Sequence, residues 1–81
     1  MRIDKFLKEA RLITRRAVAN QALREGLVTV NGRTAKPATR VKKGDIITLN
    51  FGGKLLRLEV LAVEVPRRRG GEEAALYRLL D

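Results

Sequence analysis

Apolar residues repeat every three or four positions near the start of the chain, which is the spacing of a helix with one buried face. Between residues 2 and 13 this series comprises Ile3, Phe6, Leu7, Ala10 and Ile13. Asp4 lies in the first turn, where its negative charge opposes the unpaired amide dipoles. The pattern predicts an amphipathic helix over residues 2–13, with Phe6 in the core and an electrostatic role for Asp4.

A second helix is expected directly after Thr14, whose hydroxyl can accept a hydrogen bond from a first-turn amide. Small and medium-sized apolar residues form one face of this helix: Ala17, Val18, Ala22 and Leu23. Because small side chains let helices approach closely, we expect the two helices to pack as a pair. Gly26 is expected just beyond the second helix, since glycine readily adopts the left-handed conformation that ends many helices.

Alternating apolar and polar residues beyond the second helix predict a hairpin. Residues 27–30 alternate as a strand, and Asn31-Gly32 is a strong signal for a two-residue turn because both residues tolerate positive φ. Residues 33–35 are expected to pair back on this strand until Pro37 ends the pairing.

Two longer strands are predicted further along, at residues 46–51 and near 55–65, with a glycine pair as the turn between them. In the second of these strands the apolar positions change phase after Val60. A period of two cannot make that change without an extra residue or a sharp twist. We therefore expect a bulge or bend near Val60–Ala62.

These elements predict one domain and a short tail. Residues 1–65 are expected to form an α+β domain, in which two packed N-terminal helices lie on a small, mostly antiparallel sheet. Residues 66–81 are predicted to be a basic linker, with Arg67–Arg69, followed by a short C-terminal helix at Glu72–Leu80. That helix is too short to be stable alone, so it must pack on the domain or on a partner.

The surplus of positive charge is confined to the first two-thirds of the chain. The 81 residues carry a formal net charge of +9, and residues 1–54 hold 13 Lys and Arg against four acids, whereas residues 55–81 hold five of each. Clustered cations bind polyanions by releasing condensed counterions, so this distribution favours a nucleic-acid partner over a merely soluble basic surface. The loop at residues 36–43 has four cations and no acid.

The composition argues against catalysis. The chain has no His, Ser or Cys, so it lacks the usual general base near neutral pH and the usual nucleophiles, and it cannot form disulfides or thiolate metal sites. No apolar run is long enough to cross a membrane, and the N-terminus lacks the apolar stretch of a signal peptide. We expect a cytoplasmic, non-enzymatic protein with no metal or cofactor.

Four spaced motifs together resemble the S4-type RNA-binding domain, which is named after a small-subunit ribosomal protein. They are R-I-D-K-F-L at the start, T-R-R-A-V-A after the break, G-x-V-x-V-N-G after the second helix and V-K-x-G-D before the next strand. The resemblance covers residues 1 to about 51. The whole chain is similar to the bacterial RqcP and heat-shock fifteen-kilodalton protein family of ribosome-associated quality control.

The resemblance implies a helix pair packed on a strongly bent sheet, with RNA gripped by the helices and the adjoining loop. The motif positions imply RNA contacts by Arg2, Lys5, Lys8, Arg11, Arg15, Arg16, Asn31, Gly32 and Lys36. The loop residues Lys42 and Lys43 are further candidates, and Asp4 and Asp45 match positions that we interpret as architectural.

Proteins of this family act on the large ribosomal subunit after it has split with nascent chain and tRNA attached. The resemblance implies a protein that holds the peptidyl-tRNA while a tailing factor adds alanines. The implied partners are therefore large-subunit ribosomal RNA, tRNA and that tailing factor.

We therefore expect a clamp for structured RNA that contacts mainly the sugar-phosphate backbone, associates with the ribosome and is a monomer when free. With three aromatic residues, the chain is not expected to form a stacking platform for single-stranded bases. The main alternative is an RNA-targeting accessory domain of an rRNA-modifying enzyme such as a pseudouridine synthase. A DNA-binding module and a membrane-surface helix are weaker alternatives, because the chain shows neither Asn/Gln base readers on a recognition helix nor a broad aromatic-rich apolar face.

Overall fold

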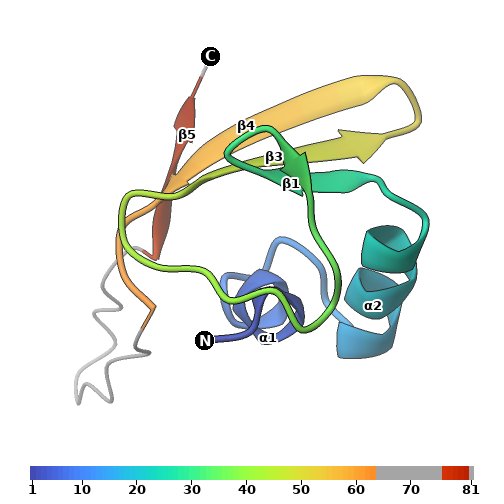
Figure 1. Ribbon diagram of the computed structural model, residues 1–81, viewed down its shortest axis with the longest axis horizontal. Coiled ribbons are helices and arrows are strands. Elements are labelled where there is room, and N and C mark those ends of the chain that lie inside the picture. The colour runs from blue at the N-terminus through green and yellow to red at the C-terminus, as the bar shows by residue number, and fades with distance from the viewer. Residues whose placement is uncertain (64–75, 81) are drawn as a thin grey trace.

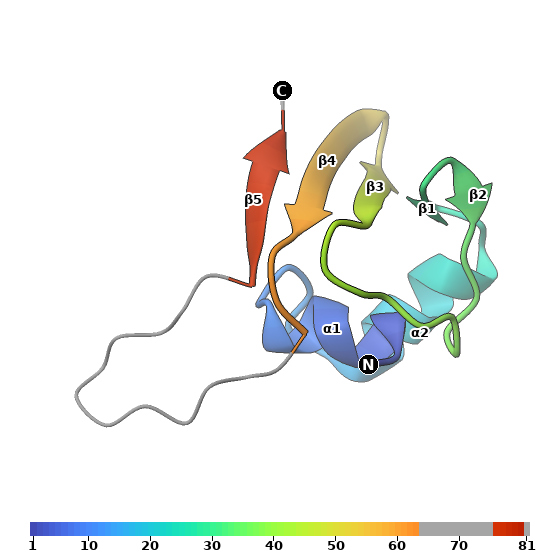
Figure 2. The same ribbon diagram turned by 60° about the vertical axis from the view of Figure 1, so that its left-hand side comes forward.

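The computed structural model describes residues 1–63 and 76–80, which form an antiparallel sheet lying on a pair of helices (Figure 1, Figure 2). The sheet has the strand order β2-β1-β3-β4-β5. The elements are α1 (Ile3–Glu9), α2 (Arg16–Arg24), β1 (Val28–Val30), β2 (Arg33–Thr34), β3 (Ile46–Phe51), β4 (Lys54–Val60) and β5 (Tyr77–Leu80). β5 runs steeply across the direction of β3 in Figure 1, so the sheet is strongly bent. The α+β class and the helix pair are confirmed.

The core lies between the two layers and has the residues that the helical spacing predicts for α1. Ile3, Phe6 and Leu7 are fully buried. They lie below the inner face of the sheet, whose buried members are Val28, Ile47, Leu49, Leu58 and Val60. Because both layers contribute large apolar side chains to one cluster, the sheet holds α1 in a fixed place.

Helix α1 ends at Glu9, earlier than predicted. Arg11 has a φ of 60°, so the chain leaves the helical conformation there. The amides of Leu12 and Ile13 both donate to the carbonyl of Leu7, which folds the chain back under the end of the helix. Ile13 is still buried, as its place in the apolar series predicts.

Helix α2 buries only part of the expected face, since Ala22 and Leu23 are in the core as predicted. Its N-cap residue is Arg15, no side chain caps it, and Thr14 is exposed, so the prediction of a threonine cap is wrong. Ala17 and Val18 are also exposed. The buried residues are Ala19, Ala22 and Leu23. Ala19 precedes the other two by three and four residues and so shares their face of the helix.

The predicted stop signal after α2 is confirmed. Gly26 has a φ of 75°, its amide donates to the carbonyl of Leu23, and the next amide, of Leu27, donates to Ala22. These two bonds are the Schellman pattern that satisfies the last carbonyls of a helix. The chain is thereby turned from α2 directly into β1.

The Asn31-Gly32 hairpin is confirmed and is joined to the start of β3. Both residues have positive φ, 52° and 82°, as the two-residue turn requires. The side chain of Asn31 donates from Nδ2 to Asp45 at 3.1 Å and accepts the amide of Ile46 at 2.9 Å. Asp45 is 5% exposed and also accepts the amide of Lys42 at 2.9 Å. These bonds confirm an architectural role for Asp45 and fix the end of the basic loop.

The irregularity predicted at residues 60–62 is present. β4 ends at Val60, and the amides of Leu61 and Ala62 then both donate to the carbonyl of Leu76, at 2.8 and 3.3 Å. Two consecutive residues facing one partner make a β-bulge. The regular strand is accordingly shorter than the predicted one at 55–65.

The predicted C-terminal helix is wrong for its last residues. Tyr77–Leu80 form β5, which pairs antiparallel with β4, and Arg78 Nε donates to Glu59 at 2.7 Å. Pairing satisfies the open edge of β4, and this tertiary contact outweighs the weak helix propensity of so short a segment. Leu76 is buried, whereas Leu79 is 59% exposed. The predicted linker and the domain boundary at residue 65 lie outside the described residues.

Candidate nucleic-acid interface

The basic loop at residues 36–43 is bound to the start of helix α1. The amide of Ile3 donates to the carbonyl of Thr39 at 2.7 Å, and the amide of Val41 donates to the carbonyl of Met1 at 3.0 Å. Arg2 and Arg40 form an antiparallel bridge between these bonds. Two segments that are far apart in the sequence therefore present their arginines next to each other.

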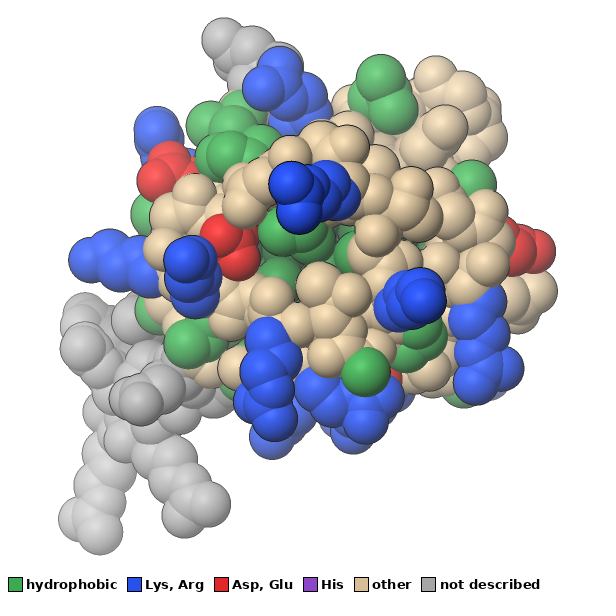
Figure 3. All heavy atoms as spheres, viewed as in Figure 1, with side chains coloured by type: hydrophobic (Ala, Val, Ile, Leu, Met, Phe, Trp, Pro, Cys, Tyr) green, Lys and Arg blue, Asp and Glu red, His purple; other side chains and the backbone are tan. Residues whose placement is uncertain are grey.

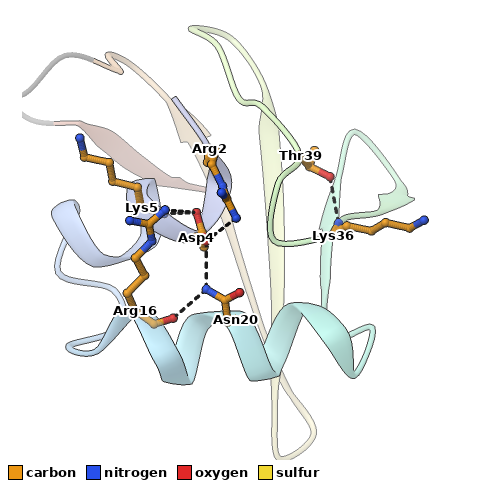
Figure 4. A network of polar contacts seen from close by, with 7 residues as sticks. All are labelled: Arg2, Asp4, Lys5, Arg16, Asn20, Lys36 and Thr39. Carbon is orange, nitrogen blue, oxygen red and sulfur yellow. Dashed lines mark hydrogen bonds and ion pairs between the residues drawn. The ribbon is translucent and has the colours of Figure 1, made fainter.

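The first part of the loop is a tight turn. The amide of Lys36 donates to Thr39 Oγ1 and the amide of Thr39 donates back to the carbonyl of Lys36, each at 2.9 Å. The Lys36 ammonium group points away from Arg2 and Asp4 in Figure 4. The structure thus separates Lys36 from the arginine cluster described next, although the sequence groups them.

Asp4 binds two cationic side chains that come from different helices, together with two uncharged donors (Figure 4). Its carboxylate accepts a terminal guanidinium nitrogen of Arg2 at 3.1 Å and one of Arg16 at 3.3 Å. It also accepts the side-chain amide of Asn20 at 2.9 Å and the backbone amide of Lys5 at 2.7 Å. We call Arg2, Asp4, Arg16 and Asn20 the Asp4 cluster.

Asp4 is 1% exposed but ionised, because its hydrogen bonds outweigh its burial. Burial alone would raise the pKa of this carboxyl. The hydrogen bonds from Asn20, Arg16 and the Lys5 amide, with the positive charge of Arg16, hold the pKa below the ordinary value of 3.8. Its contact with the Lys5 amide confirms the predicted first-turn role, and its contacts with two arginines extend that role beyond the helix.

The cluster leaves both arginines accessible. The side chains of Arg2 and Arg16 are 45% and 46% exposed, while the carboxylate between them is almost completely covered. A guanidinium group has five N–H donors, so each arginine keeps donors for a phosphate oxygen after it has bound Asp4. Asp4 also offsets the unfavourable position of Arg16 at the positive end of helix α2.

The other predicted cations lie in the helical region around the cluster and in the basic loop. Lys8 and Arg11 line a shallow groove with Glu9 and Thr14 at the turn between the helices. The remaining ones are exposed: Lys5, Arg15, Lys42 and Lys43. Figure 3 shows Lys and Arg side chains outnumbering acidic ones on the face seen there. The combined surface is open and cationic, which suits an extended polyanion better than a small molecule.

Asn31 and Gly32 differ from the other predicted site residues, because their observed interactions are structural. They form the hairpin turn, and the Asn31 side chain is occupied by Asp45 and the amide of Ile46. Sequence reasoning omitted Arg40 from the individual site residues. The run of cations without an acid in the loop could have indicated that Arg40 belongs to the site. Its position opposite Arg2 could not be predicted, because it depends on a bridge between residues far apart in the sequence.

Within residues 1–63 and 76–80, no group of three or more His, Cys, Asp or Glu side chains could hold a metal ion. No helix in the same residues is long and apolar enough to cross a membrane.

Comparison with known proteins finds a matching domain family, near full-length relatives and a similar solved structure. The S4 domain family matches residues 1–47. A protein of Halalkalibacterium halodurans named RQC P-site tRNA stabilizing factor is 44% identical, and the match covers 98% of this chain and 89% of that protein. A Bacillus subtilis protein of the same name is 42% identical over 99% of this chain and 92% of its own length. The trimeric structure of Vibrio cholerae heat shock protein 15 is similar with a TM-score of 0.83, at 34% identity over 99% of this chain and 81% of that one.

Proposed function

Because the chain belongs to the S4 domain family, we propose that it is a non-catalytic RNA-binding protein that stabilises P-site tRNA on the large ribosomal subunit during ribosome-associated quality control. The near full-length similarity to proteins named RQC P-site tRNA stabilizing factor supports this assignment. The partners are large-subunit ribosomal RNA, tRNA and the tailing factor that extends the nascent chain. The protein works in the cytoplasm, attached to the ribosome.

The observation that carries the proposal is the Asp4 cluster with Arg40 beside it. The side chains of Arg2 and Arg16 meet at Asp4, and the backbone of Arg40 in the basic loop pairs with that of Arg2. Guanidinium groups bind phosphate oxygens through two parallel hydrogen bonds, and structured RNA is recognised largely through its backbone and 2′-hydroxyls. Such a cluster can bind RNA without catalysing a reaction, so it needs no side chain that acts as a general acid or base at neutral pH.

Each predicted site residue has a place in this function. Lys5, Lys8, Arg11 and Arg15 extend the contact along the helices, and Lys42 and Lys43 extend it along the loop. Lys36 points away from the Asp4 cluster (Figure 4) and contacts a separate part of the RNA. Asn31 and Gly32 act through the hairpin, which sets the position of the loop end at Asp45.

Sedimentation with purified large subunits tests the function. We expect the protein to co-sediment with subunits that carry peptidyl-tRNA, and less with empty subunits, because tRNA and ribosomal RNA both supply phosphates. Excess duplex DNA should not displace it. Equal binding to both kinds of subunit, or displacement by DNA at the concentration at which RNA competes, would contradict the proposal.

The free protein is proposed to be a monomer. Cations dominate its surface and repel second copies at low salt. Sedimentation velocity should give the mass of a single chain, and a trimer like that named for the Vibrio cholerae protein would overturn this point.

A further inference from the structure

Asp4 is a buried carboxylate in the middle of a basic surface. Its negative charge weakens the field that attracts RNA, and yet it is 1% exposed and accepts four hydrogen bonds. Two of its four donors are arginines that the proposed function assigns to RNA. A purely electrostatic RNA-binding surface would bind more tightly without this residue.

The geometry gives Asp4 control over where both arginines point. Arg2 lies at the N-cap of α1 and Arg16 opens α2, so their backbones belong to different helices. Their terminal nitrogens reach the two oxygens of one carboxylate, at 3.1 Å from Oδ2 and 3.3 Å from Oδ1. A single side chain therefore brings the two guanidinium groups together.

Asn20 holds the carboxylate in place. Its side-chain amide nitrogen lies 2.9 Å from Asp4 Oδ2 and 3.2 Å from the carbonyl oxygen of Arg16. One amide group thereby links Asp4 to the first turn of α2, where Arg16 is located.

We propose that Asp4, supported by Asn20, is a positioning residue that holds Arg2 and Arg16 side by side so that both engage one stretch of RNA backbone. This inference rests on the proposed function. Long side chains lose conformational freedom when they bind, and fixing two of them beforehand removes part of that cost. The gain corresponds to about tenfold in affinity.

Replacing the carboxylate by its amide separates positioning from charge. Asp4→Asn raises the net charge by one and should nevertheless weaken binding of deacylated tRNA by about tenfold. The control is Glu25→Gln, which makes the same charge change at the exposed C-cap of α2 and should leave the affinity unchanged or slightly higher. If folded Asp4→Asn binds tRNA as tightly as the natural protein, the inference is wrong.

A double-mutant cycle excludes a purely structural explanation. In a protein carrying Arg2→Gln and Arg16→Gln, Asp4→Asn should cause no further loss of tRNA affinity, because the residues it positions are gone. A further tenfold loss in that background would overturn the inference. Thermal unfolding of each variant shows that the proteins compared are folded.

Asn20→Ala provides the second test if Asp4→Asn does not fold. This change leaves the carboxylate and both arginines in place and removes the amide that supports them, so we expect a severalfold loss of tRNA affinity. Unchanged affinity would count against the inference. The outcomes also separate this inference from the proposed function: binding to tRNA without binding to large subunits would refute the function alone.

Discussion

Arg40 lies opposite Arg2 because the basic loop and the start of α1 pair as an antiparallel bridge. Its side chain is exposed, so removing it should not disturb the core. We predict that Arg40→Ala weakens tRNA binding about three- to tenfold, the effect of losing one charge-assisted phosphate contact, with no change in melting temperature. Electrophoretic mobility shift and thermal unfolding measure the two quantities.

The matched control for Arg40 is Lys54→Ala. Lys54 is an exposed cation at the turn between β3 and β4, which lies at the opposite end of the molecule from the start of α1 (Figure 1, Figure 2). The two variants have the same net charge. Equal losses of affinity would mean that total charge, and not the position of Arg40, determines binding.

The lowered pKa of Asp4 predicts how stability depends on pH. A carboxyl whose pKa is lower in the folded protein stabilises it above the ordinary value of 3.8, and this contribution disappears as the pH falls through the lowered pKa. The free energy of unfolding of the natural protein should exceed that of Asp4→Asn by a constant amount from about pH 5 to 8, and the difference should shrink below about pH 4. Urea denaturation at each pH tests this, and a difference that persists unchanged at the acid end would contradict it.

Single residues also show what the sequence could and could not reveal about the site. The cations were identifiable individually, because charge and motif position are local properties. Their grouping was not, since Asp4 and Arg16 are 12 positions apart and meet only when α1 packs on α2. The opposite orientation of Lys36 likewise follows from a turn that Thr39 closes.

At the scale of elements, predictions based on glycine and Asn-Gly turn signals were accurate, whereas the predicted threonine cap of α2 was wrong. Gly26 ended α2, and Asn31-Gly32 and Gly52-Gly53 formed the two hairpin turns, because few residues other than Gly and Asn adopt positive φ. The errors occurred where tertiary contacts decide. Which face of α2 is buried depends on how the helix packs on the rest of the molecule, and this packing buries Ala19 in place of Ala17 and Val18. Tyr77–Leu80 form a strand because β4 offers an edge to pair with.

The segment containing β5 should contribute to stability chiefly through Leu76. Leu76 is 8% exposed, and its carbonyl accepts both amides of the bulge. We predict that Leu76→Ala lowers the free energy of unfolding by about 2–3 kcal/mol, as for other buried leucines. The control Leu79→Ala, in the same segment but 59% exposed, should cost less than about 1 kcal/mol. Denaturant titration measures both, and similar costs would mean that β5 does not depend on this buried contact.

At the scale of the whole molecule, binding should depend steeply on salt. The charge surplus lies in residues 1–54, which contain the helices, the basic loop and the first three strands. If about five phosphates are neutralised, the logarithm of the binding constant should fall with the logarithm of salt concentration with a slope of about −3 to −5. Filter binding to ribosomal RNA gives this slope, and a flat response would exclude a backbone clamp.

The hydrogen bond from Val41 to the Met1 carbonyl has a practical implication for handling the protein. Because the first residue is fastened beside Arg2 and Arg40, any affinity tag fused ahead of it would emerge directly at the surface assigned to RNA. β5 instead ends at Leu80 on the side of the sheet away from α1 (Figure 2). Purification handles and fluorophores therefore belong at the carboxyl end, and an amino-terminal fusion could mimic a loss-of-function mutant.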